Sequence, residues 1–237
     1  MVINLISSPR TISTALMYSF AQRDDMAVID EPYYGYYLAT TGLDHPGKQE
    51  TIDSEPTTLT DVQHKIETQA KNKPHLFLKN IASHAGILDP AIAIDFQNVI
   101  LTRDPRRIIT SFSKVIHHPT HRDIGIKTQW ELLTYYREHG KYTPIVIDSQ
   151  DVLQRPEKML TNLCTYLSLD FQDSMLSWEA GPKVYDGTWA KYWYKSVHKS
   201  TGFSPSRLSK DPVPKHLDKL AEEAMTYYKK LSDHKLK

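Results

Sequence analysis

The stretch Ser7-Ser8-Pro9-Arg10-Thr11-Ile12-Ser13-Thr14 decides the fold of this chain. It follows the apolar run Val2–Ile6, and one face of a helical pattern then carries Ile12, Leu16, Met17, Phe20 and Ala21. The order is a strand, a tight loop and a helix start. Unpaired N–H groups at a helix start and the helix dipole favour an anion. Arg10 adds a positive charge, and the hydroxyl donors are those of Thr11, Ser13 and Thr14.

A second stretch of the same kind begins at Arg103-Asp104-Pro105. It closes the apolar run Val99–Leu101 and enters another helical pattern, with Ser111 eight residues after Arg103. Open α/β sheets bind ligands beyond the carboxyl ends of their strands. We therefore expect Arg103 and Ser111 to form a second anion site, and the two sites together to bind a ligand with two separated anionic groups.

Strand-like and helix-like runs alternate along the rest of the chain. The expected strands are Val2–Ile6, Ala27–Ile29, His75–Leu78, Asn98–Leu101 and Ile145–Ile147. The expected helices are Ser13–Arg23, Thr58–Asn72, Pro105–His117, Lys127–His139, Pro156–Leu167 and Pro214–Ser232. Short strands that are apolar throughout are typical of a parallel sheet covered by helices on both faces. We therefore predict an α/β fold of three layers with about five parallel strands.

The whole chain, residues 1–237, is predicted to form a single domain. Residues 42–57 contain His45-Pro46-Gly47 and Glu55-Pro56 and are expected to form a loop. Residues 181–213 mix glycine, proline, serine and aromatic residues, and we expect a long segment that covers the site. Residues 214–232 are expected to form a structural helix at the C-terminus.

Composition favours a cytoplasmic enzyme. Hydrophobic residues make up 40% of the chain, and 29 Lys and Arg against 28 Asp and Glu give a net charge of +1, so no strong field attracts nucleic acid. A single cysteine, Cys164, suits a reducing compartment. The first strand begins at Val2, which leaves no room for a signal peptide, and no apolar run approaches the roughly 20 residues of a membrane helix. We expect neither a nucleic-acid partner nor a membrane partner.

The order of these motifs resembles the sulfotransferases that use 3′-phosphoadenosine 5′-phosphosulfate (PAPS). Pro9–Thr14 is similar to the family's 5′-phosphosulfate loop, with Ile12 in place of a glycine, and Ala15 stands where the family often has tryptophan. The family's 3′-phosphate motif is matched by Arg103, Asp104, Pro105 and Ser111. Residues 183–189 resemble its nucleotide-covering loop, and the likeness extends over roughly residues 2–195. The resemblance implies a three-layer P-loop-type fold.

The resemblance also implies roles for individual residues. The catalytic residues would be Arg10, Glu31, Lys79 and His84. The residues that bind PAPS, or its product 3′,5′-adenosine bisphosphate, would be Arg10, Thr11, Ile12, Ser13, Thr14, Arg103, Ser111, Lys183 and Trp189, and no metal is expected.

Two residues compete for the role of the base that takes the acceptor proton. Glu31 directly follows a strand, whereas His84 lies five residues beyond Lys79 and needs a loop that folds back. The family's Lys-x-His signature is absent, because Ile81 stands where that histidine would fall. We therefore favour Glu31 and keep His84 as the alternative.

Aromatic residues bear on the acceptor and gather in two groups. They are Tyr33, Tyr34, Tyr36 and Tyr37, then Trp178, Trp189, Tyr192, Trp193 and Tyr194. Some of them belong to the core, and the others could enclose an aromatic, amphipathic or cationic small molecule that carries a hydroxyl or, less favoured, an amine.

Three further interpretations are weaker. The histidines His117, His118 and His121 could suggest a metal site, but a solvated helix end explains them better. A nucleotide kinase shares the strand–loop–helix start, yet the chain lacks Gly-x-x-x-x-Gly-Lys-[Ser/Thr]. A catalytically silent nucleotide-binding protein is the other alternative, because Ile12 replaces a permissive glycine.

Overall fold

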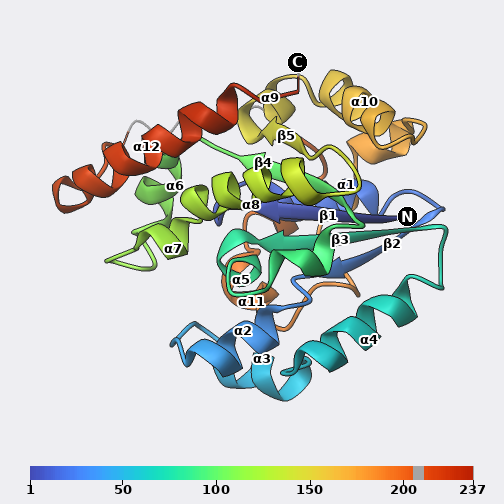
Figure 1. The fold of residues 1–237 in the computed structure, drawn as a ribbon, viewed down its shortest axis with the longest axis horizontal. Helices are drawn as coiled ribbons and strands as arrows, with labels where there is room; N and C mark the ends of the chain where they lie inside the picture. The colour runs from blue at the N-terminus through green and yellow to red at the C-terminus, as the bar shows by residue number, and fades with distance from the viewer. Residues whose placement is uncertain (205–210, 237) are drawn as a thin grey trace.

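The centre of the molecule is a parallel sheet (Figure 1). In the computed structural model, which describes residues 1–204 and 211–236, this sheet has five strands in the order β2-β3-β1-β4-β5. The strands are β1 (Val2–Ser7), β2 (Met26–Asp30), β3 (His75–Ile81), β4 (Gln97–Thr102) and β5 (Ile145–Asp148). Every neighbouring pair is parallel. The predicted α/β fold and its five strands are confirmed.

Both faces of the sheet are buried, which explains why the strands are apolar throughout. Ile3 and Leu5 of β1 belong to one core, while Ile6 belongs to the core on the other face. The same alternation along β3 places Phe77 in the first core, and Leu76 and Leu78 in a third apolar cluster. Successive strand residues point to opposite faces, so a run without polar residues requires cover on both sides.

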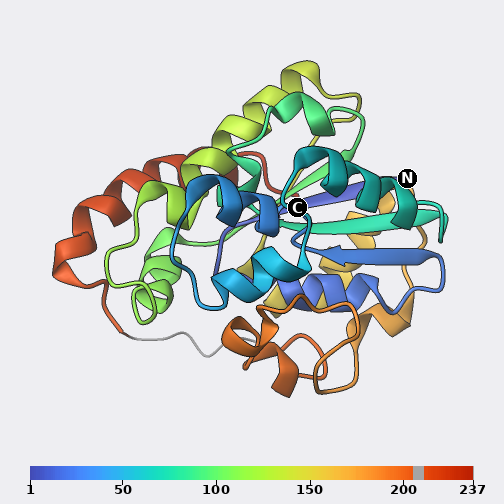
Figure 2. The same ribbon diagram turned by 90° about the horizontal axis from the view of Figure 1, so that it is seen from below.

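Helices provide that cover. The longer ones are α1 (Ser13–Phe20), α4 (Leu59–Gln69), α6 (Pro105–Phe112), α8 (Ile126–His139), α10 (Pro156–Tyr166) and α12 (Asp218–Ser232). Figures 1 and 2 show α8 and α12 side by side on one face of the sheet and α1 on the other. Local sequence sets several helix starts: Thr58 caps α4, and Asp104 caps α6, whose first residue is Pro105.

Several predicted boundaries were wrong. The helix predicted over Pro105–His117 ends at Phe112, and a separate short helix, α7 (His121–Ile124), follows. Residues 42–57, predicted as a loop, contain α3 (Lys48–Ser54), and α2 (Tyr34–Thr41) precedes them. The C-terminal helix begins at Asp218 rather than Pro214, after the 3₁₀ turn η4 (Lys215–Leu217). The remaining short elements are α5 (Ala82–Ala85), α9 (Ser149–Gln154), α11 (Ala190–Trp193), η1 (Pro90–Ala93), η2 (Asp173–Leu176) and η3 (Val197–Lys199).

The predicted covering segment is described as far as Ser204, and its residues 205–210 lie outside the described part. Residues 181–204 contain α11 and η3 and lie beside α1 (Figure 2). Tyr18 of α1 donates a hydrogen bond to Asp186, at 2.7 and 2.8 Å from the two carboxylate oxygens. The Gly187 N–H donates to Asp30 Oδ2 at 3.2 Å. The segment is therefore fastened both to α1 and to the end of β2.

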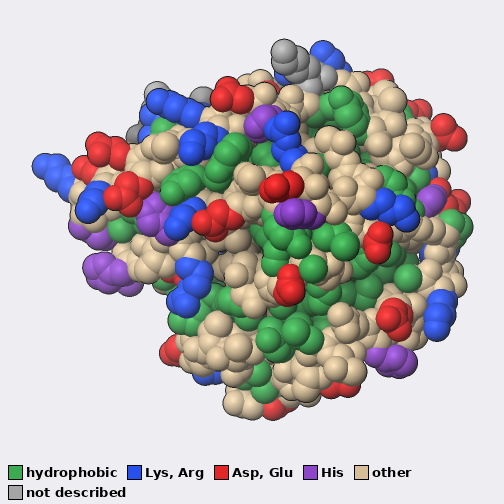
Figure 3. All heavy atoms as spheres, in the orientation of Figure 1, with side chains coloured by type: hydrophobic (Ala, Val, Ile, Leu, Met, Phe, Trp, Pro, Cys, Tyr) green, Lys and Arg blue, Asp and Glu red, His purple; other side chains and the backbone are tan. Residues whose placement is uncertain are grey.

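The surface seen in Figure 3 carries interspersed positive and negative side chains rather than a field of one sign. This agrees with the net charge of +1. No helix within residues 1–204 and 211–236 combines the length and apolar character needed to cross a bilayer.

The core predicts a large effect of one substitution on stability. Phe77 is fully buried and stacks on Phe20 with 4.6 Å between ring centroids. Phe77→Ala should lower the free energy of unfolding by about 3–5 kcal/mol. Tyr166 is 62% exposed, so Tyr166→Ala should change it by less than about 0.5 kcal/mol. Urea unfolding of both variants tests this expectation, and similar losses from the two would contradict the assigned core.

Candidate active site

A cavity of about 510 Å³ opens at the carboxyl edge of the sheet. The cavity is lined by residues at, or just after, the carboxyl ends of four different strands, because the carboxyl ends of parallel strands meet at one edge of the sheet. The sequence-predicted residues that line it are Arg10, Thr11, Ile12, Ser13, Thr14, Glu31, Lys79, His84, Arg103, Ser111 and Trp189. Lys183 is the exception. Its Nζ donates to the Glu179 carbonyl at 2.7 Å, away from this lining.

The two predicted anion sites are joined through Arg10. Its Nε donates to Ser111 Oγ at 3.0 Å, and the Arg103 guanidinium donates to the Arg10 carbonyl. Arg10 itself has a left-handed backbone, with φ at 58°. Ile12 stands where the PAPS-dependent sulfotransferases have a glycine. Its φ is −101°, a conformation open to any residue, so this position requires no glycine here.

The chemistry of these loops fits an anionic ligand. Neither Arg10 nor Arg103 has a carboxylate within ion-pair distance among residues 1–204 and 211–236, and burial lowers the pKa of both guanidinium groups. The N-terminus of α1 has no side-chain cap, so its first N–H groups are available. A partly buried cation without a counter-charge costs free energy, and an anion bound between these groups would offset that cost.

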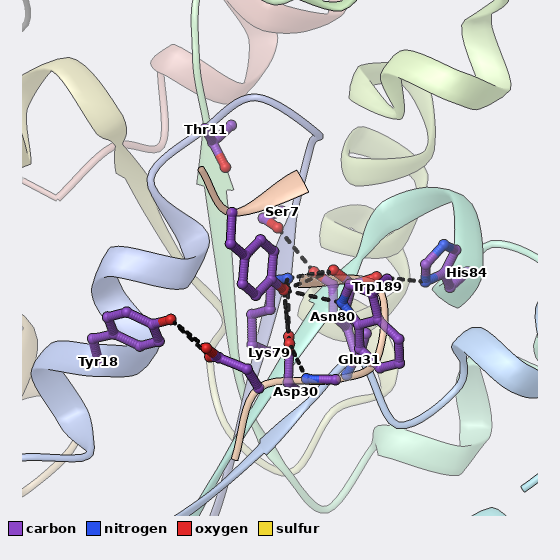
Figure 4. A network of polar contacts seen from close by, with 12 residues as sticks. Ser7, Thr11, Tyr18, Asp30, Glu31, Lys79, Asn80, His84 and Trp189 are labelled. Carbon is purple, nitrogen blue, oxygen red and sulfur yellow. Dashed lines mark hydrogen bonds and ion pairs between the residues drawn. The ribbon is translucent and has the colours of Figure 1, made fainter. Parts of the chain in front are cut away.

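A buried charge cluster lies at the ends of β2 and β3 (Figure 4). Lys79 Nζ donates to Asp30 Oδ1 at 3.0 Å, to Tyr194 Oη at 2.6 Å and to Glu31 Oε1. Register explains the meeting, because Asp30 pairs with Lys79 across the two strands. Burial lowers the pKa of Lys79, but the two carboxylates reverse that effect and the net shift is upward.

Glu31 is the carboxylate of this cluster that borders the cavity. Burial raises its pKa to about 7; Lys79 opposes the rise and the negative charge of Asp30 adds to it. Its backbone has φ at 40°, held by a hydrogen bond from its N–H to the Lys79 carbonyl at 2.7 Å. A carboxyl group with a pKa near neutrality is suited to accept and release a proton.

His84 lies beside Glu31 without any loop folding back, contrary to the expectation. The short helix α5 follows β3 directly and carries it there. The imidazole lies between the rings of Tyr34 and Tyr37, each with 4.5 Å between centroids. Its Nδ1 is 3.5 Å from Glu31 Oε2 and makes no hydrogen bond. Burial and the nearby His45 and Lys79 hold the pKa of His84 well below its usual value, so the ring is neutral at pH 7.

Trp189 contacts two residues that lie close to Glu31. Its Nε1 donates to Tyr194 Oη at 3.1 Å, and its ring meets Tyr34 edge-on at 5.1 Å between centroids. Gly187 lies against the indole so closely that a Cβ there would come within 2.1 Å of it. These contacts place Trp189 beside the charge cluster.

From the sequence, Asp30 had no assigned role, and Tyr194 was only one of the aromatic residues that could enclose the acceptor. Asp30 accepts from Lys79, from Tyr194 and from the Gly187 N–H, yet it reads in the sequence only as the neighbour of Glu31. Tyr194 lies 164 positions from Asp30, and no local pattern announces that contact. The sequence did offer one signal for the charge cluster: an Asp-Glu pair at the end of one strand and a lysine at the end of another.

His118 and His121, for which a solvated helix end was favoured over a metal site, contact other side chains. His121 Nε2 lies 2.6 Å from Glu223 Oε2, and the ring of His118 contacts that of His216. Throughout the described part of the chain, no group of three or more His, Cys, Asp or Glu side chains is arranged to hold a metal ion.

Two relatives are similar in sequence over 98% of this chain. They are branched-chain-amino-acid aminotransferase-like proteins 2 and 1 of Arabidopsis thaliana, each 38% identical over 237 residues. The chain spans only 42% of the length of either relative.

Solved structures share the fold at low sequence identity. The sulfotransferase domain of the curacin biosynthetic pathway has a TM-score of 0.55 and 16% identity, covering 97% of this chain and 96% of that one. The sulfotransferase domain of the Synechococcus PCC 7002 olefin synthase has a TM-score of 0.54 and 20% identity, covering 94% and 93%. The sulfotransferase of Alicyclobacillus acidocaldarius has a TM-score of 0.56 and 9% identity, covering 98% and 96%.

The family assignment rests on the sequence as a whole. A family model described as a sulfotransferase domain matches residues 1–234, which includes every strand of the sheet and the whole lining of the cavity. The chain therefore belongs to the sulfotransferase domain family.

Proposed function

We propose that this chain transfers the sulfuryl group of PAPS to a hydroxyl of a small-molecule acceptor. The observation that carries the proposal is the pair of guanidiniums without carboxylate partners, Arg10 and Arg103, which open onto the same cavity as Glu31. A donor with two anionic groups would supply the missing counter-charges. The family membership and the fold support the same reaction class.

Each end of the donor has residues suited to it. Arg10 and the uncapped start of α1 would hold the 5′-phosphosulfate, and Arg103 with Ser111 would hold the 3′-phosphate. The donor supplies an activated sulfuryl group on a phosphate leaving group. The scheme uses no metal ion, and Lys183 has no part in it.

Proton removal would fall to Glu31. An acceptor hydroxyl close to Glu31 Oε2 would pass its proton to that carboxylate while its oxygen bonds to sulfur and the bond from sulfur to the 5′-phosphate oxygen breaks. Arg10 would stabilise the charge that develops on the leaving phosphate. Neutral His84, 3.5 Å from Glu31 Oε2, is the alternative proton acceptor.

The acceptor end of the cavity favours a small molecule with polar groups. Tyr34, Tyr37 and His45 line it, and Tyr37 Oη has no hydrogen-bond partner although it is buried. Such an orphaned hydroxyl costs free energy unless a ligand satisfies it. An alcohol fits the site better than an amine, because an amine protonated at neutral pH has no lone pair to attack sulfur.

The first prediction concerns nucleotide recognition. At saturation, 3′,5′-adenosine bisphosphate should stabilise the protein by on the order of 3–4 kcal/mol if its concentration exceeds the dissociation constant a few hundredfold. 5′-AMP should stabilise it much less, because Arg103 and Ser111 would lack their phosphate. Thermal shift measures both, with ADP plus magnesium as the comparison for a kinase. Equal shifts from the bisphosphate and 5′-AMP would remove the second anion site from the proposal.

The second prediction concerns Arg103 itself. Arg103→Ala should weaken bisphosphate binding by about 1.5–3 kcal/mol, the scale of a charge-assisted hydrogen bond. Turnover at saturating donor should change less. Arg106→Ala is the matched control, since Arg106 lies three residues further along, in the first turn of α6, but is exposed and pairs with Asp104. Calorimetric affinities that fall equally in both variants would show a general charge effect instead of a phosphate contact.

The third prediction separates the two candidate bases. Glu31→Gln should lower turnover at least about 10²-fold and keep the nucleotide affinity, whereas His84→Asn should retain most activity. For wild-type enzyme, kcat/KM should be full above pH 7 and fall as the pH drops through about 7, because protonated Glu31 cannot accept a proton. An inactive His84→Asn beside an active Glu31→Gln would assign the base to the histidine.

A further inference from the structure

Lys79 has no N–H group left for a ligand in this arrangement. An ammonium group has three donors. Those of Lys79 go to Asp30, Glu31 and Tyr194, and its side chain is only 1% exposed. Lys79 nevertheless lines the cavity. If it stabilises a sulfuryl group there, one of its three present contacts has to be given up.

The three contacts differ in how firmly their acceptors are held. Asp30 lies outside the cavity lining and also accepts from the Tyr194 hydroxyl, at 2.7 and 2.8 Å, and from the Gly187 N–H. Tyr194 Oη also accepts from Trp189 Nε1. Glu31 borders the cavity; its Oε1 has one further and longer contact, with the Tyr194 hydroxyl at 3.4 Å, and its Oε2 faces His84 without a hydrogen bond. The contact with Glu31 is therefore the one that can be exchanged with least disruption.

We propose that a sulfuryl oxygen of the bound donor replaces Glu31 on Lys79, while Asp30 and Tyr194 act as positioning residues that hold the amine in place. Donor binding then frees Glu31 to meet the acceptor hydroxyl. The inference rests on the proposed function and adds an order to it: the base becomes available only after the donor has bound. It also explains why a lysine should be buried between two carboxylates at the edge of a cavity that binds anions.

The exchange has an electrostatic consequence at Glu31. The titratable groups that face Glu31 from the surrounding elements are Asp30 of β2, Lys79 of β3, Tyr34 of α2, His84 of α5 and Tyr194 of the covering segment. Only Lys79 among them is cationic, because His84 is neutral. When Glu31 loses its contact with Lys79 and an anion lies nearby instead, the pKa of Glu31 rises above about 7.

Proton uptake on donor binding is the measurable result. A higher pKa of Glu31 in the complex means that, near neutral pH, binding takes up a fraction of a proton per PAPS. Calorimetric titration with PAPS in two buffers of different ionisation enthalpy measures this quantity. Glu31→Gln, which cannot titrate, should take up none. The acid limb of kcat should also lie at higher pH than that of kcat/KM, since turnover depends on the ionised fraction in the complex.

The positioning role has its own matched pair of variants. Tyr194→Phe removes the hydroxyl that holds Lys79 and should lower turnover about tenfold. Tyr18→Phe removes another hydroxyl that fastens the covering segment, through Asp186, and Tyr18 makes no hydrogen bond to the charge cluster, so turnover should stay near wild type. Equal losses in the two variants would mean that Tyr194 only anchors the segment, which would overturn its role toward Lys79.

The outcomes separate this inference from the function on which it rests. PAPS binding without proton uptake, or with the same uptake in Glu31→Gln, would overturn the exchange and leave the sulfotransferase proposal standing. Failure of PAPS to bind at all would overturn both.

Discussion

One cation shared by two buried carboxylates governs the architecture of this site. Placing Lys79, Asp30 and Glu31 out of water is costly, and the arrangement is tolerable only because each polar atom finds several partners. Two of those partners, Tyr194 and the Gly187 N–H, come from the covering segment. The strand ends and the covering segment therefore stabilise each other, since neither has its hydrogen bonds satisfied without the other.

Backbone strain gathers at the same edge of the sheet. Arg10 and Glu31 both have positive φ, a conformation that costs a non-glycine residue about 1–3 kcal/mol. Each is held by a neighbouring strand end: Arg103 donates to the Arg10 carbonyl, and the Glu31 N–H donates to the Lys79 carbonyl. Both strained residues line a common cavity, to which they contribute one guanidinium and one carboxylate.

Sequence patterns predicted the sheet well and the site only in part. Apolar strands such as Val2–Ile6 follow from burial on both faces, so their number and their parallel direction could be inferred, whereas their order in the sheet was not predicted. Arg10, Glu31 and Arg103 could be placed at the carboxyl edge of the sheet because each lies within three residues of the end of a strand. Tyr194 and Asp30 could not be paired in advance, because their contact joins β2 to a segment without periodicity. Helix α3 was missed because the prolines and glycines that flank it dominate the local pattern. Lys183 lies outside the cavity lining, and a motif resemblance carries no information about side-chain direction.

The distribution of charge divides the cavity into two functional ends. Among residues 1–204 and 211–236, Arg10 and Arg103 have no carboxylate within ion-pair distance, which suits an anionic ligand, whereas Lys79 lies between two carboxylates. Burial is the main cause of the raised pKa of Glu31; Lys79 opposes that rise, and the negative charge of Asp30 adds to it. Glu31 therefore has a proton affinity near neutrality, while the two guanidiniums at the other end are suited to the anionic donor that we propose. If each guanidinium were paired with a carboxylate, that end of the cavity would not attract an anion.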